Sequence, residues 1–192
     1  MKELLKLIIV LGIICCFSAL SLAYVYNITF EPIERQRFLK KMNAINEVFA
    51  GFADAAEFDV VENPVCEKVY CADFSDFYLI KHFGEVLGVA FEVRVSGYGG
   101  DINIVIGVLP DGSVSGIKVI HHSETPGLGS LIERDSFTGQ FETKSLDTGL
   151  KFRSDGGDVD VITGATISAR AVLNAVTAGL EFFRDQKTNI IN

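Results

Sequence analysis

A run of twenty residues near the start of the chain carries no charge. It extends from Leu7 to Tyr26 and reads LIIVLGIICCFSALSLAYVY. As an α-helix, a run of this length spans roughly 30 Å, which matches the hydrocarbon core of a bilayer. Tyr24 and Tyr26 lie at its end, where aromatic residues favour the membrane interface. The sequence therefore predicts a membrane anchor over residues 1–27, followed by a separate folded part.

The same run has a second interpretation, as a cleaved secretory signal. Lys2 and Lys6 form a basic start, and Ser21-Leu22-Ala23 is an acceptable small-x-small cleavage site. The apolar run is longer than the ~7–15 residues of a typical signal core, and this length favours an uncleaved anchor.

The side of the membrane on which the folded part lies is not decided by charge. Four basic residues, Arg35, Arg37, Lys40 and Lys41, follow the span, and they outnumber the two that precede it. Long domains are translocated largely regardless of charge. A single N-terminal span before a whole domain is the usual plan of an exported protein. We therefore expect the residues after about 27 on the periplasmic or extracytoplasmic side of the inner membrane.

Charge and the spacing of cysteines and histidines argue against a nucleic-acid partner and against a metal site. The net charge of −8 at pH 7 argues against a nucleic-acid partner, whose phosphates require a basic surface. Cys66 and Cys71 lie in the presumed exported part, where a local disulfide is the ordinary expectation. A metal site needs further ligands nearby, and the histidines at 82, 121 and 122 do not supply that spacing. No metal is expected.

Beyond the span, the hydrophobic pattern changes from helical to β-like. Pro32 suits the first turn of a helix, and apolar residues then recur at helical spacing, which predicts an amphipathic helix over about 32–57. These residues are Phe38, Met42, Ile45, Phe49 and Phe52. From Phe77 onward, short β-like runs alternate with glycines, and Asp111-Gly112 is typical of a hairpin turn. A last amphipathic helix is expected from about Thr166 to Gln186.

This order of elements predicts an α+β fold, an antiparallel sheet with flanking helices, preceded by one N-terminal transmembrane helix. Residues 28–75 form the helix and a connecting loop, and residues 76–192 form the main domain. No glycine-rich phosphate loop follows a strand at the spacing of a dinucleotide-binding fold. No nucleophile with an identifiable base suggests a hydrolase, so no catalytic residue is assigned.

Two stretches of the domain are candidates for binding. The first is HHSETPGLGS, residues 121–130, in which Gly127 and Gly129 flank Leu128 after Pro126. Such a loop leaves backbone amides open and projects one apolar side chain alone. By itself, this stretch is also explained as an ordinary Pro-Gly turn.

The second stretch is DVITGATISARAVLNAV, residues 160–176, at the start of the last helix. Thr163, Thr166 and Ser168 crowd one turn beside Gly164 and Ala165, although one hydroxyl is enough to cap a helix. The free amides and dipole of a helix start favour a phosphate, and the two small residues leave its approach open.

Together, the two stretches resemble the FMN-binding domain of the G subunit of the Rnf (Rsx) ion-translocating electron-transport complex. The family pattern is Asp, two variable residues, Ser or Thr, Gly, Ala and Thr. Asp160, Thr163, Gly164, Ala165 and Thr166 match it position by position. The resemblance covers nearly the whole chain, including the N-terminal span, GYGGDI, ETPGLG and the terminal helix.

The resemblance implies a function and a role for each matched residue. Thr166 would carry covalent FMN through a phosphoester made by a separate flavin transferase, while Thr163 would cap or orient the turn. The flavin ring would rest against Glu124, Thr125, Gly127, Leu128 and Gly129. The chain would relay electrons to other membrane subunits of a ferredoxin/NAD oxidoreductase complex coupled to ion translocation. It would act as one subunit of a translocase and not as an enzyme alone.

Two other interpretations remain open at this point. The C subunit of the sodium-pumping NADH:quinone reductase shares the threonine motif, although it is typically a longer chain. A tethered binding module with the same fold but no flavin belongs to a different class, and the intact motif around Thr166 argues against it.

Overall fold

The computed structural model describes residues 1–51, 57–61, 68–69, 72–82 and 85–191. Cys66 and Cys71 lie outside the described residues, so the expected disulfide stays a prediction. The chain divides into two compact units, residues 1–40 and residues 41–192.

The first element is one long helix, α1, which extends from Lys2 to Phe49. The expectation that a separate helix begins at Pro32 is wrong, because Pro32 lies inside α1. A proline removes one backbone hydrogen bond from a helix without always ending it. The residues that follow Pro32 are mostly good helix formers, which allows the helix to continue. The helix also ends earlier than expected, at Phe49 and not near residue 57.

The N-terminal part of α1 meets the length and composition required to cross a membrane. Its most apolar 18-residue window has a mean hydropathy of 2.5, and none of that window is buried. Large apolar side chains from Leu4 to Phe30 are exposed all around the helix. A helix that is apolar on every side is typical of a segment surrounded by lipid.

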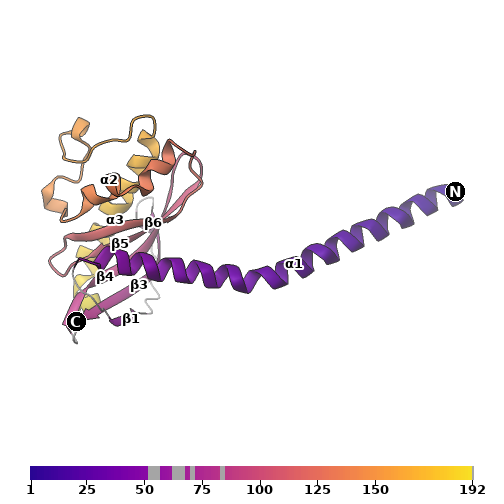
Figure 1. Cartoon of the computed structure of the whole chain (residues 1–192), viewed down its shortest axis with the longest axis horizontal. Helices are drawn as coiled ribbons and strands as arrows, with labels where there is room; N and C mark the ends of the chain where they lie inside the picture. The colour runs from indigo at the N-terminus through magenta and orange to yellow at the C-terminus, as the bar shows by residue number, and fades with distance from the viewer. Residues whose placement is uncertain (52–56, 62–67, 70–71, 83–84, 192) are drawn as a thin grey trace. The chain divides into compact units, whose positions relative to one another are not determined.

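The folded domain is built on an antiparallel sheet. Its strands are β1 (Glu57–Val61), β2 (Lys68–Val69), β3 (Ala72–His82), β4 (Glu85–Ser96), β5 (Asp101–Val108) and β6 (Val114–His121). Their order is β1-β3-β4-β5-β6 (Figure 1). Strand β2 also pairs with β3. After β6 come a 3-10 helix, η1 (Gly129–Glu133), the short helix α2 (Asp135–Thr138), three more 3-10 turns and the long helix α3 (Thr166–Ile191). The expected α+β class is confirmed.

Alternation along the strands gives the sheet two apolar faces. Ile102, Ile104 and Ile106 of β5 lie in the larger core, together with Val172 and Val176 of α3. Gly179 of α3 lies so close to the sheet that an added Cβ would be 2.6 Å from the ring of Phe91. Helix α3 therefore packs closely on one face.

The opposite face is covered by the last two turns of α1. Ala44, Ile45, Val48 and Phe49 are buried there against Tyr78, Ile80, Ala90 and Val105 of the strands. Two ion pairs flank this contact, Lys41 to Glu92 at 2.6 Å and Lys118 to Glu47 at 2.5 Å. The hydrogen bond to Glu47 is the main reason that the pKa of Lys118 is raised. The end of α1 is thus part of the domain core.

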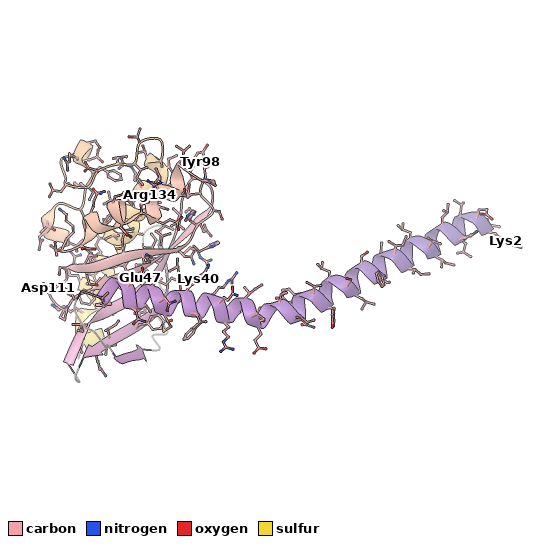
Figure 2. All side chains as sticks on the ribbon, viewed as in Figure 1. Lys2, Lys40, Glu47, Tyr98, Asp111 and Arg134 are labelled. Atoms are coloured by element: carbon pink, nitrogen blue, oxygen red, sulfur yellow. The ribbon has the colours of Figure 1, made fainter. Side chains whose placement is uncertain are left out.

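The two ends of the β5–β6 pair carry different loops. The β5–β6 hairpin turns at Asp111-Gly112 as expected, with Gly112 at φ +91° and its N–H bonded to the carbonyl of Leu109 at 2.9 Å. The loop that enters β5 and the segment that leaves β6 lie at the other end of the same two strands, since Asn103 pairs with His121. Figure 2 shows Tyr98 and Asp111 well apart in the domain. The candidate site lies at the Tyr98 end.

Candidate functional site

Three segments that are distant in sequence meet on one buried carboxyl group. They are the β4–β5 loop at residues 97–100, the segment at 122–128 that follows β6, and the start of α3 at 166–168. Glu124 belongs to the second segment, and only 5% of its surface is exposed. Its two carboxyl oxygens contact the other two segments.

Hydrogen bonds divide between the two oxygens of Glu124. Oε1 accepts the backbone N–H of Tyr98 at 2.7 Å and that of Gly99 at 3.2 Å. Oε2 accepts the hydroxyl of Ser168 at 2.8 Å. A buried carboxyl group costs free energy unless it is hydrogen-bonded, and here both oxygens have partners. Glu124 therefore links both loops to the start of α3.

The carboxyl group of Glu124 lies where the side chains of neighbouring residues would be if these residues were not glycine. A Cβ added at Gly129 would lie 2.5 Å from Oε2 of Glu124, and one at Gly97 would overlap Oε1. A Cβ at Gly99 would overlap the carbonyl oxygen of Ser123. Gly97, Gly99 and Gly129 are thus explained by close approach to Glu124 and its neighbour Ser123.

His122 supports the same segment from outside. Its Nδ1 accepts the backbone N–H of Glu124 at 3.1 Å, and its Nε2 lies 2.8 Å from Oε1 of Glu133. Within the part of the chain that the structure describes, no group of three or more potential metal ligands is found.

We expect Glu124→Ala to lower the free energy of unfolding by about 3 kcal/mol, because it leaves the buried Ser168 hydroxyl and the loop amides without their acceptor. Chemical denaturation followed by circular dichroism measures this change. Glu142 is an exposed glutamate, so Glu142→Ala is the matched control, and we expect it to change stability by less than about 0.5 kcal/mol. Equal stabilities of the two variants would show that the Glu124 bonds contribute nothing net.

The turn before α3 presents the threonine motif. Ala165 donates its N–H to the carbonyl of Ile162 at 3.0 Å, which closes a turn with Gly164 at φ +83°. Thr166 is the first residue of α3, and it is exposed, as is Thr163. Neither threonine hydroxyl forms a side-chain hydrogen bond among the residues that the structure describes. The motif thus places two free hydroxyl groups at the surface.

Ser168 has the opposite environment to the two threonines. It is 1% exposed, and its hydroxyl is bonded to Glu124. The third hydroxyl of the crowded turn is therefore a structural group. Sequence alone did not assign this role, because it depends on a partner 44 residues away.

The segment at 124–129 combines buried and exposed members. Glu124 and Gly129 are buried, whereas Thr125, Gly127 and Leu128 are exposed. Gly127 has φ +76°, and its N–H is bonded to Oγ of Ser130 at 2.9 Å. A Cβ on Gly164 would lie 3.2 Å from Cδ2 of Leu128, so this segment reaches the turn before Thr166.

Three large apolar side chains are exposed on the segments that Glu124 joins, and they are termed the apolar patch. Tyr98 is 72% exposed, Leu128 47% and Ile167 56%. Among the described residues from 41 to 187, these are the exposed large apolar side chains. Each lies on a different one of the three segments that Glu124 joins. An apolar patch on an otherwise polar surface is typical of a ligand or partner site.

Charged residues lie on both sides of the motif. Arg153 contacts both oxygens of Asp160, with Nε at 3.1 Å from Oδ1 and Nη2 at 3.3 Å from Oδ2. Arg170 is placed one helical turn after Thr166, the spacing at which two side chains share a helix face. Its guanidinium lies 5.0 Å from the ring centre of Phe152 and 3.3 Å from Asp155.

Comparison with known proteins identifies the class of this domain. Residues 97–181 match the FMN-binding domain family, and that range contains all three segments of the site. The crystal structure of Shewanella oneidensis NqrC has the same fold, with a TM-score of 0.55, at 20% identity and over 76% of this chain and 87% of that one. Fold and site together define an FMN-binding domain.

Similarity over the full length defines the family. The G subunit of the ion-translocating oxidoreductase complex of Vibrio cholerae is 30% identical, over 96% of this chain and 92% of the relative. The G subunit of the proton-translocating ferredoxin:NAD(+) oxidoreductase complex of Clostridium ljungdahlii is 32% identical, over 89% and 86%. The chain belongs to the family of G subunits of ion-translocating oxidoreductase complexes.

Proposed function

We propose that this chain is a membrane-anchored electron carrier whose FMN is bound covalently to Thr166. The observation that carries the proposal is the placement of Thr166, an exposed hydroxyl at the first position of α3, beside the exposed Leu128 and Ile167. The family membership supports a role as a subunit of an ion-translocating oxidoreductase.

The residues around Thr166 fit a phosphate ester followed by an apolar ring. The first-turn amides of α3 have no helical acceptors of their own, and the helix dipole favours negative charge there. The guanidinium of Arg170 carries five N–H donors, so its contact with Asp155 leaves others for a phosphate oxygen. The flat flavin ring suits the apolar patch.

Attachment is a phosphoryl transfer from FAD, made by a separate flavin transferase. The Thr166 oxygen forms a new bond to the phosphorus on the FMN side, the pyrophosphate bond breaks, AMP leaves and the hydroxyl proton is released. Ser168 is not a competing acceptor, because its hydroxyl is buried and bonded to Glu124. The surface position of Thr166 gives the transferase access.

When bound, FMN supplies reversible one- and two-electron chemistry. This chain contributes the attachment point, the apolar surroundings of the ring and a position open to neighbouring subunits. The domain lies on the periplasmic or extracytoplasmic side in this proposal, held by the apolar part of α1. NADH and ferredoxin react on other subunits of the complex.

Membrane fractionation with in-gel flavin fluorescence tests this function directly. With a flavin transferase co-expressed, the denatured full-length chain of 21.0 kDa should fluoresce in the membrane fraction. Protease added to spheroplasts should digest the domain if it lies outside the cytoplasm. A non-fluorescent band, or full-length chain in the soluble fraction, would contradict the proposal.

We expect Gly164→Ala to slow flavin attachment as well as to destabilise the domain. A residue with a Cβ at φ +83° costs about 1–2 kcal/mol, and here the Cβ also meets Leu128. Gly112→Ala is the matched control, since Gly112 has φ +91° with open space around it, in the distant β5–β6 hairpin. Both variants should lose similar stability in thermal unfolding, and only Gly164→Ala should reduce the initial rate of labelling. Equal rates would show that the geometry of the turn does not matter for attachment.

A further inference from the structure

Tyr98 is a large side chain in a position that packing alone does not explain. It is 72% exposed, although the backbone around it is closely held. Gly97 N–H is bonded to the carbonyl of Gly100 at 2.8 Å, and Tyr98 N–H is bonded to Glu124 at 2.7 Å. The structure thus fixes the backbone and leaves the aromatic ring at the surface.

Glu124 links the backbone of Tyr98 to the start of α3. The same carboxyl group that accepts the Tyr98 amide also accepts the hydroxyl of Ser168, two residues after Thr166. Both bonds leave little freedom for the β4–β5 loop to move independently of the start of α3. The segments that carry Tyr98, Leu128 and Ile167 are therefore held together at the start of α3.

We propose that Tyr98 is a ring-contacting residue of the flavin site, and that Glu124 is the positioning residue that holds it there. This inference rests on the proposed function, attachment of FMN to Thr166. The occupant of the apolar patch is then the isoalloxazine ring of the same molecule. A ring tethered at Thr166 meets Leu128 and Ile167 next to its attachment point and Tyr98 across the patch.

The chemistry of the two rings suits this contact. Aromatic rings gain from offset stacking or edge-to-face packing beyond the apolar area they bury. A tyrosine in contact with a flavin also quenches its fluorescence by electron transfer, so the contact has a signature separate from activity. Shielding by Tyr98 further reduces the access of a dissolved quencher to the ring.

The test uses the full-length, flavin-labelled chain in detergent, with iodide as the fluorescence quencher. We expect Tyr98→Ala to increase both the flavin fluorescence and its quenching by iodide, since loss of an aromatic pair lowers the equilibrium constant for docking of the ring about two- to tenfold. Tyr98→Phe should keep the low iodide access of the wild type. Glu124→Ala should shift both readouts toward those of Tyr98→Ala, because it removes both oxygens that hold the β4–β5 loop and the Ser168 hydroxyl.

Glu142→Ala, at an exposed position, is the control that should match the wild type in both readouts. If Tyr98→Ala carries the adduct but has the fluorescence and iodide quenching of this control, the Tyr98 contact is wrong and the proposed function stands. If Tyr98→Ala responds and Glu124→Ala does not, the positioning role of Glu124 is wrong. If the wild-type chain carries no adduct, the proposed function fails and this inference fails with it. Intact mass measured on every sample separates these outcomes.

Discussion

Thr166→Ala should abolish covalent flavin completely. In the proposed reaction the Thr166 oxygen becomes part of the phosphoester, so its removal leaves no bond to form. The other hydroxyl groups of the turn do not substitute, because Thr163 lies before Gly164 and Ser168 is buried. Intact mass spectrometry after incubation with a flavin transferase and FAD measures the adduct as FMN less one water.

Two further variants make this result specific. Thr166→Ser keeps a hydroxyl group and should retain partial labelling. Thr163→Ala should retain labelling, because the Thr163 hydroxyl is exposed and the turn is closed by the bond from Ala165 N–H to the carbonyl of Ile162. Covalent flavin on the alanine variant at 166 would show that the acceptor is another residue. An adduct that maps to Ser168 would contradict the assignment even though the family is established.

A chain that begins at residue 52 should lose most of its stability, whereas one that begins at residue 41 should fold. The difference is expected because Ile45 and Phe49 are buried against the face of the sheet opposite α3. Full burial of two such side chains contributes about 3–6 kcal/mol, a large part of the total stability of a domain. The longer chain also keeps the Lys41–Glu92 ion pair.

Both truncated chains can be exported with a substitute signal and compared by thermal unfolding and gel filtration. The chain 41–192 should be monomeric and unfold cooperatively, and with the transferase it should still acquire flavin. The chain 52–192 should aggregate, because Ile80 and Val105 are then exposed. Equal midpoints for the two chains would mean that the end of α1 is only a linker.

Local patterns in the sequence predicted most of the fold. Alternation with glycine breaks predicted the antiparallel strands from Phe77 onward, and Asp111-Gly112 predicted the hairpin, because a tight turn requires a residue that tolerates positive φ. The start of α3 at Thr166 was also correct. The expectation of only a helix and a connecting loop over 28–75 is wrong, because β1, β2 and the first residues of β3 lie there. The predicted bounds of α1 were wrong, because the sequence around a proline does not distinguish the first turn of a helix from its interior.

The centre of the site was beyond sequence reasoning for a physical reason. The place of Glu124 beside the flavin ring stays a prediction, and the structure adds that its carboxyl group is buried and bonded to Tyr98, Gly99 and Ser168. These bonds join residues 25 to 44 positions apart, which no periodicity encodes. The glycines of GYGG were the one visible signal, because closely spaced glycines mark a close backbone approach.

The central claim is that Thr166 carries the flavin, and peptide mapping tests it most directly. Trypsin should release the peptide 154–170 between Arg153 and Arg170, which contains Thr163, Thr166 and Ser168. Tandem mass spectrometry of the labelled wild-type chain should locate the mass of FMN less water on Thr166 alone. An unmodified peptide from a chain incubated with active transferase and FAD, or a modification on any other residue, would contradict the account.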